Sequence, residues 1–168
     1  MTDKRAFDPE SILRALERYG VDYVVIGGLA ASLHGSSVVT TDVDVTPSRE
    51  RENLARLARA LEAIDARIRA PDAPEGLPFD RSAEALSRSD MLNLTTLHGD
   101  LDLSFVPAGT GGYRDLRGNA SEITIRGTRV IVAALADVIR SKEAANREKD
   151  RLALPALRRL LAKRSRTE

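Results

Sequence analysis

Cysteine is absent from this chain of 168 residues. Its absence excludes disulfide bonds, thiolate zinc sites and a cysteine nucleophile, and it agrees with a reducing cytoplasm. Aromatic residues make up only 4% of the sequence, so the core must be built from aliphatic side chains. No stretch approaches the roughly 20 apolar residues of a membrane span, and the sequence opens without an apolar signal segment. We therefore expect a cytoplasmic protein that does not enter a membrane.

Length and composition are those of one globular unit. Hydrophobic residues account for 42% of the chain and charged residues for 30%, which argues against disorder and against a fibrous class. The formal net charge is only +1, yet arginine and lysine are concentrated from Arg140 onward. We expect a single domain over residues 1–168.

The spacing of apolar residues and of turn residues predicts alternating helices and strands. A first helix should begin at Pro9, behind Asp8 as its N-cap, and should end at Gly20. The other predicted elements are a strand at 21–26, a helix at 29–34, a strand at 40–45, a helix at 48–63, strands at 91–97 and 101–106, two short strands within 123–131, and helices to the end.

Three expectations concern the boundaries of these elements. Ser48 should cap the helix that follows it. Residues 71–78 are rich in proline and should form a mobile loop. Pro155 lies within the last helical stretch and should break it, because proline lacks the N–H that the helix needs.

An acidic pair, Asp42 and Asp44, lies in a predicted strand shortly after Gly27 and Gly28. Side chains at i and i+2 of a strand point to one face, where two carboxylates repel each other unless a cation lies between them. Mg²⁺ prefers oxygen ligands and keeps positions open for phosphates, while glycines let phosphates approach backbone N–H groups. Alone, each feature is more often an edge strand or an ordinary turn. Together they predict a nucleotide site.

A third acid, Asp102, lies on another predicted strand. If that strand runs beside the strand of Asp42, three carboxylates converge and can bind two Mg²⁺ ions that orient a nucleoside triphosphate (NTP). Asp102 would then be a metal ligand or a general base. Asp100 shares its face by the same alternation, so the pattern leaves the choice between Asp100 and Asp102 open.

Residues 25–35 and 41–45 resemble the nucleotidyltransferase superfamily typified by DNA polymerase beta, whose signature is a glycine pair followed by an acid-x-acid strand. The form with His34 and Gly35 is most similar to the minimal bacterial nucleotidyltransferases, including toxins of the AbiE abortive-infection type. The resemblance implies an α/β fold, with a mixed sheet flanked by helices over about 21–131. Helices over about 132–168 would close the cleft.

The resemblance extends into the carboxy-terminal part. Residues 135–142 and 147–150 are similar to the helical segments in which these proteins place a lysine and, one loop later, an Arg-x-Lys-Asp group. This implies that Lys142 contacts the phosphates and that Asp150 orients Lys142 or its loop. Many relatives carry an arginine where this chain has residues 36–39, which implies one phosphate or substrate contact fewer.

The predicted function is Mg²⁺-dependent transfer of a nucleoside monophosphate from an NTP to an acceptor hydroxyl. A tRNA, a protein and a small molecule all present such a hydroxyl, and the likeness to toxins adds an antitoxin as a partner. The alternative is a non-catalytic, nucleotidyltransferase-like binding or regulatory protein, whose basic tail holds nucleic acid. The acidic cluster disfavours this alternative, because without catalysis nothing offsets the repulsion among three carboxylates.

Overall fold

The computed structural model describes residues 5–167. Its helices are α1 (Pro9–Arg18), α2 (Gly27–Leu33), α3 (Arg51–Ala63), α4 (Ala83–Ser87), α5 (Tyr113–Asn119), α6 (Leu135–Ala145) and α7 (Glu148–Ser165). Its strands are β1 (Tyr23–Ile26), β2 (Asp42–Pro47), β3 (Arg67–Ala70), β4 (Ala73–Leu77), β5 (Met91–Thr96), β6 (Gly99–Ser104), β7 (Ser121–Ile125) and β8 (Thr128–Val132).

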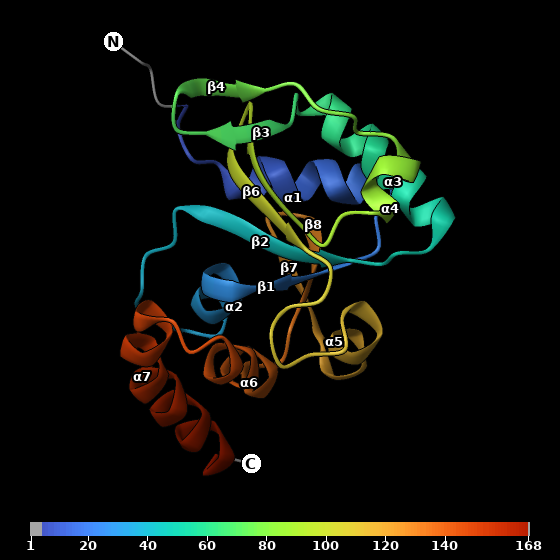
Figure 1. Cartoon of the computed structure of the whole chain (residues 1–168). Coiled ribbons are helices and arrows are strands. Elements are labelled where there is room, and N and C mark those ends of the chain that lie inside the picture. Colours follow the sequence, from blue (N-terminus) through green and yellow to red (C-terminus); the bar gives the residue numbers. More distant parts are fainter. Residues whose placement is uncertain (1–4, 168) are drawn as a thin grey trace.

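One mixed sheet organises the molecule. Within the described residues it has eight strands in the order β4-β3-β5-β6-β2-β1-β8-β7, and the β2–β6 and β1–β8 pairs are parallel. Figure 1 shows α1 and α3 on one side of this sheet and α2, α5 and α6 on the other. The predicted α/β fold with a mixed sheet and carboxy-terminal helices is confirmed.

The core is aliphatic, as the scarcity of aromatic residues predicts. Val43 and Val45 of β2 and Leu101 and Leu103 of β6 are fully buried in the middle of the sheet. Burial of such a side chain stabilises the fold by about 1.5–3 kcal/mol. Of the largest fully buried side chains, Phe105 alone is aromatic among the described residues. The apolar face of the β2–β6 pair is therefore the rigid support for whatever lies on its other face.

The amino-terminal helix forms as its capping residues predict. Asp8 is the N-cap of α1, Pro9 occupies the first helical position, and the Asp8 side chain accepts a hydrogen bond from the backbone N–H of Ser11 at 3.1 Å. Ile12 and Leu16 lie on the inner face of the helix and are buried. Capping and apolar spacing act together here, which is why the sequence predicted the element closely.

The predicted loop at residues 71–78 is wrong, because most of it belongs to a β-hairpin. β3 and β4 pair in antiparallel fashion, with Ile68 opposite Leu77 and Ala70 opposite Ala73. Pro74 lies within β4, which is an edge strand of the sheet. An edge strand tolerates proline because one of its sides forms no ladder, so the prolines did not prevent pairing.

The prediction that Ser48 caps the next helix is also wrong. The N-cap of α3 is Glu50, and Ser48 instead accepts a hydrogen bond from the Glu50 backbone N–H at 3.3 Å. Asn53 donates from Nδ2 to the Ser48 carbonyl at 2.9 Å, which holds Ser48 in the turn that leaves β2. The Ser48 backbone N–H also donates to the Asp22 carbonyl at 3.0 Å, and this tertiary contact holds Ser48 before the start of the helix.

Pro155 does not break the last helix, so that prediction is wrong as well. α7 runs from Glu148 to Ser165 with the proline inside it. Leu154 and Leu157 are buried on either side of Pro155, so packing offsets the lost backbone hydrogen bond. No helix in residues 5–167 combines the length and apolar character that a membrane crossing requires.

α7 is anchored to the end of α2 through a histidine. Arg164 donates to the His34 carbonyl at 2.6 Å, and its Nη1 lies 2.8 Å from His34 Nδ1. The other ring nitrogen of His34 lies 2.7 Å from the Ala133 carbonyl. The histidine at the end of α2 therefore joins the carboxy-terminal helix to the loop that follows β8.

We expect Leu101→Ala to lower the free energy of unfolding by about 2–5 kcal/mol, because the side chain is fully buried and its removal leaves a cavity. Leu152→Ala is the matched control, since Leu152 is 76% exposed, and it should cost less than about 0.5 kcal/mol. Urea titrations monitored by circular dichroism measure both. Equal losses in the two variants would contradict this account of the core.

Candidate active site

Parallel pairing of β2 with β6 brings the predicted acids together. In this register Asp42 lies beside Asp100, and Asp44 lies beside Asp102. The valines of β2 alternate with its acids and enter the core, so the carboxylates stand on the opposite face. The condition that the sequence left open, adjacency of the two acidic strands, is met.

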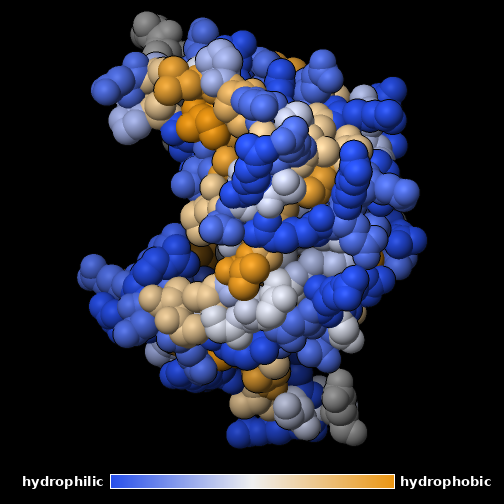
Figure 2. Space-filling model, turned by 45° about the vertical axis from the view of Figure 1, so that its right-hand side comes forward, coloured by the Kyte–Doolittle hydropathy of each residue, from blue (hydrophilic) through white to orange (hydrophobic). Residues whose placement is uncertain are grey.

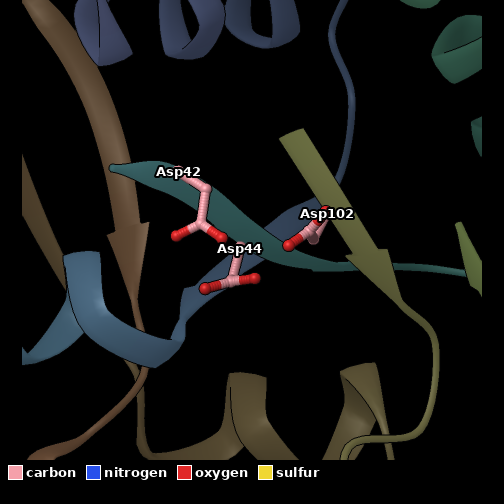
Figure 3. Close-up of side chains that lie close together, drawn as sticks. All are labelled: Asp42, Asp44 and Asp102. Carbon is pink, nitrogen blue, oxygen red and sulfur yellow. The ribbon is translucent and has the colours of Figure 1, made fainter. Parts of the chain in front are cut away.

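Three carboxylates form one cluster on that face. Asp42, Asp44 and Asp102 each offer an oxygen, and these oxygens all lie within 4.8 Å of one another. Figure 3 shows Asp42 and Asp44 projecting from β2 and Asp102 directed toward them from β6. We call these three residues the acidic cluster. Asp100, which the alternation could not separate from Asp102, is outside it.

The acidic cluster is electrostatically strained without a cation. Burial raises the pKa of Asp44 to about 7, and the charges of Asp42 and Asp102 contribute to the same upward shift. Burial also raises the pKa of Asp102 to about 6, although the guanidinium of Arg69 opposes the shift. Hard oxygen ligands that repel one another in a partly buried site fit a divalent cation such as Mg²⁺.

The glycine pair makes room for the acids. Gly27 has a φ of +64°, and a Cβ built on it would lie 2.5 Å from Asp44 Oδ2. A Cβ on Gly28 would lie 3.2 Å from Thr40 Oγ1, and this hydroxyl donates to the Asp42 carbonyl at 2.9 Å. Glycines at positions 27 and 28 therefore allow the start of α2 to pack directly against the cluster.

Lys142 and Asp150 lie together, as the resemblance implies, but they form a separate group. Lys142 Nζ is 3.6 Å from Asp150 Oδ1, and the fully buried Asp150 accepts from the Arg147 backbone N–H at 3.1 Å and from Arg147 Nε at 2.7 Å. Burial works to raise the pKa of Asp150, but the hydrogen bonds from Arg147 and the charge of Lys142 lower it overall. Among the ion pairs of residues 5–167, none joins Lys142 to the acidic cluster.

Two cationic residues near the cluster were missed by the sequence reasoning. Arg69 of β3 donates to Asp102 Oδ1 at 2.9 Å, and its Nε lies 3.3 Å from Asp100 Oδ2. The exposed Lys149, at the start of α7, lowers the pKa of Asp44 through its charge. The alternation of arginine and apolar residues at 67–70 was the available signal for a strand. No local pattern indicates the aspartates that Arg69 contacts.

The surface is hollowed near these strands. A depression of about 360 Å³ lies at the carboxyl ends of β2 and β6, lined in part by Pro47, Phe105 and Tyr113. Pro47 and Phe105 each follow an acid of the cluster by three residues, which corresponds to about 10 Å along a strand. Figure 2 shows a second feature, a notch in the outline at the left of the view.

The raised pKa of Asp44 predicts a pH dependence of stability in the absence of metal. Because the pKa is raised from 3.8 in the unfolded chain to about 7 in the folded one, the protonated acid stabilises the fold at low pH. This contribution is lost as pH rises through about 7. In EDTA, the unfolding midpoint of the wild type should therefore fall relative to that of Asp44→Asn between pH 4 and about pH 8. Thermal unfolding at several pH values measures this, and parallel curves would contradict it.

We expect Gly27→Ala to weaken Mn²⁺ binding, because the new Cβ displaces the Asp44 carboxylate. Gly127→Ala is the matched control, since Gly127 also has a positive φ, +85°, but no neighbouring atom lies within 4 Å of the position that a Cβ would occupy there. Both variants should lose about 1–3 kcal/mol of stability from backbone strain. Only Gly27→Ala should lose metal affinity in a Mn²⁺ titration followed by electron paramagnetic resonance (EPR). Equal Mn²⁺ affinities in the two variants would show that Gly27 does not contribute to the metal site.

Comparison with solved structures identifies the fold. The lincosamide antibiotic adenylyltransferase LnuA, with bound lincomycin, aligns with a TM-score of 0.61 and 16% identity over 93% of this chain and 99% of LnuA. The antibiotic-resistance factor ANT(2'')-Ia aligns with a TM-score of 0.53 and 20% identity over 95% of this chain and 90% of its own.

A Thermotoga maritima protein described as a nucleotidyltransferase aligns with a TM-score of 0.51 and 15% identity, covering 97% of this chain and 99% of its own. No family model and no curated protein matches the sequence. The narrower likeness to AbiE-type toxins stays a prediction. The chain has the mixed α/β fold of the nucleotidyltransferases, and on this fold it carries an acidic cluster suited to a divalent metal ion.

Proposed function

We propose that this protein is a metal-dependent nucleotidyltransferase that transfers a nucleoside monophosphate from an NTP to an acceptor hydroxyl and releases pyrophosphate. The observation that carries the proposal is the convergence of Asp42, Asp44 and Asp102, whose oxygens lie within 4.8 Å of one another. A fold shared with nucleotidyltransferases supports the same conclusion.

Each member of the acidic cluster has a role in this proposal. Asp42, Asp44 and Asp102 hold two Mg²⁺ ions, which supply charge stabilisation at phosphorus and activation of the acceptor hydroxyl. Asp102, which shares the cluster with the other two acids, is in addition the candidate general base.

The phosphates of the NTP are assigned to the neighbouring elements. Gly27 and Gly28 offer backbone N–H groups at the start of α2, next to the side chains of Asp44 and Thr40. Lys142 is proposed to contact the triphosphate, with Asp150 orienting it across 3.6 Å. Lys149 adds a positive charge near the cluster, since its charge lowers the pKa of Asp44.

The acceptor belongs to one of three classes: a tRNA, a protein or a small molecule. The depression near the ends of β2 and β6, about 360 Å³, is within the size range of small-molecule pockets, although no acid of the cluster lines it. LnuA, a structural neighbour, is an antibiotic adenylyltransferase solved with bound lincomycin, which is a small molecule. A tRNA acceptor would suit a toxin with an antitoxin partner, and an acceptor screen distinguishes the classes.

A second candidate is a non-catalytic binding or regulatory protein with the same fold. It is favoured by the stretch at residues 36–39, which carries no arginine and instead exposes Val38 and Val39, the latter by 86%. A cation that many relatives place in this stretch is therefore absent here, and with it a phosphate contact. Metal-dependent NTP binding without transfer to any acceptor would favour this candidate.

The first test is a thermal-shift titration with each of the four NTPs, with and without Mg²⁺. A ligand that binds only the folded state raises its unfolding temperature, so the wild type should show a Mg²⁺-dependent rise. Asp44→Asn should abolish this rise while the fold is retained, and Glu75→Gln, at an exposed position of β4, is the control that should behave as wild type. An unchanged rise in Asp44→Asn would overturn the site assignment.

Transfer itself is tested with NTPs labelled at the α-phosphate and with pools of tRNA, protein and small hydroxyl compounds. Label should pass to one pool, and Asp44→Asn should lower the rate at least about 100-fold, because the lost ligand removes several kcal/mol of charge stabilisation. Transfer at the wild-type rate by Asp44→Asn would contradict the mechanism.

A further inference from the structure

We propose that Arg69 is a positioning residue that determines which acid of β6 enters the metal site, by holding Asp100 away and fixing Asp102 in place. The inference rests on the metal-binding part of the proposed function. It concerns a residue of β3, a strand that the sequence did not predict.

The backbone alone does not choose between the two acids. In the β2–β6 register, Asp100 lies beside Asp42 in the same way that Asp102 lies beside Asp44. Both side chains project from the same face of β6, because they are two residues apart. A site built only from strand pairing would therefore contain four carboxylates, yet the cluster contains three.

The side chain of Arg69 makes the surroundings of Asp100 and Asp102 different. Its side chain crosses β5, where it donates to the Leu94 carbonyl at 2.9 Å, and reaches β6. There it donates to Asp102 Oδ1 at 2.9 Å, and its Nε lies 3.3 Å from Asp100 Oδ2. Only the contact with Asp102 is a hydrogen bond, because the Nε–H of Arg69 has no hydrogen-bond partner and its contact with Asp100 is an ion pair. The guanidinium therefore fixes Asp102 in direction and attracts Asp100 by charge.

The two ion pairs have different consequences. Asp100 is 34% exposed and directs its carboxylate to the guanidinium, so it lies outside the cluster. Asp102 is only 18% exposed, and its Oδ1 accepts a hydrogen bond from Arg69. Figure 3 shows the Asp102 carboxylate directed toward Asp42 and Asp44. Arg69 therefore limits the site to three acids and fixes the direction of the third.

A double-mutant cycle with Mn²⁺ as the probe tests this without an acceptor or an NTP. The proteins are wild type, Arg69→Met, Asp100→Asn and the double variant, and EPR of free Mn²⁺ gives the affinity of each. With Arg69 present, Asp100→Asn should change the affinity by less than about threefold, because Asp100 is not a ligand. Without Arg69, Asp100 is free to bind, so the same substitution should weaken affinity by about tenfold or more.

Arg67→Met is the matched control. Arg67 lies on the same strand, two residues away, and pairs with Asp65 at 3.2 Å. It should bind Mn²⁺ with wild-type affinity. Circular dichroism establishes that each variant is folded, and Arg69→Lys replaces Arg69→Met in the cycle if the latter fails to fold. Lysine can hold only one acid at a time, so the coupling should then be smaller but of the same sign.

The outcomes separate this inference from the proposed function. If Asp100→Asn has the same effect with and without Arg69, Arg69 acts only through its charge or through general stability, and the positioning role is overturned while the metal site stands. If the wild type does not bind Mn²⁺ and Asp44→Asn makes no difference, both the inference and the proposed function are overturned. Coupling of the expected size and sign supports both.

Discussion

Repulsion among three carboxylates is the constraint on which the rest of the site depends. Parallel pairing of β2 with β6 places Asp44 beside Asp102, and alternation along β2 adds Asp42. The aliphatic face behind these strands is fully buried, so the strands cannot separate to relieve the repulsion. Burial, together with this repulsion, raises the pKa of Asp44 to about 7, and the cost is offset when a cation or protons occupy the cluster.

The neighbouring elements are arranged around this cluster. Gly27 lets the start of α2 approach Asp44 where any side chain would collide, and Thr40 holds the backbone at Asp42. Arg69 of β3 donates to Asp102, and Lys149 of α7 contributes positive charge near Asp44. Residues from four separate segments therefore tune one group of acids, which is the arrangement expected where a metal ion must be bound and yet remain open to a substrate.

Local patterns predicted those elements whose cause is local. Asp8 and Pro9 predicted the start of α1, and alternation in β2 predicted which side chains face the core. Prediction failed where distant contacts prevail over local preference. The hairpin of β3 and β4 forms despite its prolines because β5 provides a strand for β3 to pair with, and α7 continues through Pro155 because Leu154 and Leu157 are buried. Ser48 does not cap α3, because its backbone N–H donates to the carbonyl of Asp22, which precedes β1.

The sequence by itself determined that Asp42 and Asp44 share a face, because the period of a strand is a local property of the backbone. It also indicated the glycine pair and the third acidic strand. Only the tertiary structure decided that this strand lies next to β2, and that Asp102 rather than Asp100 joins the cluster. That choice depends on Arg69, which is far away in the sequence and reaches the acids only because β3, β5 and β6 are neighbours in the sheet.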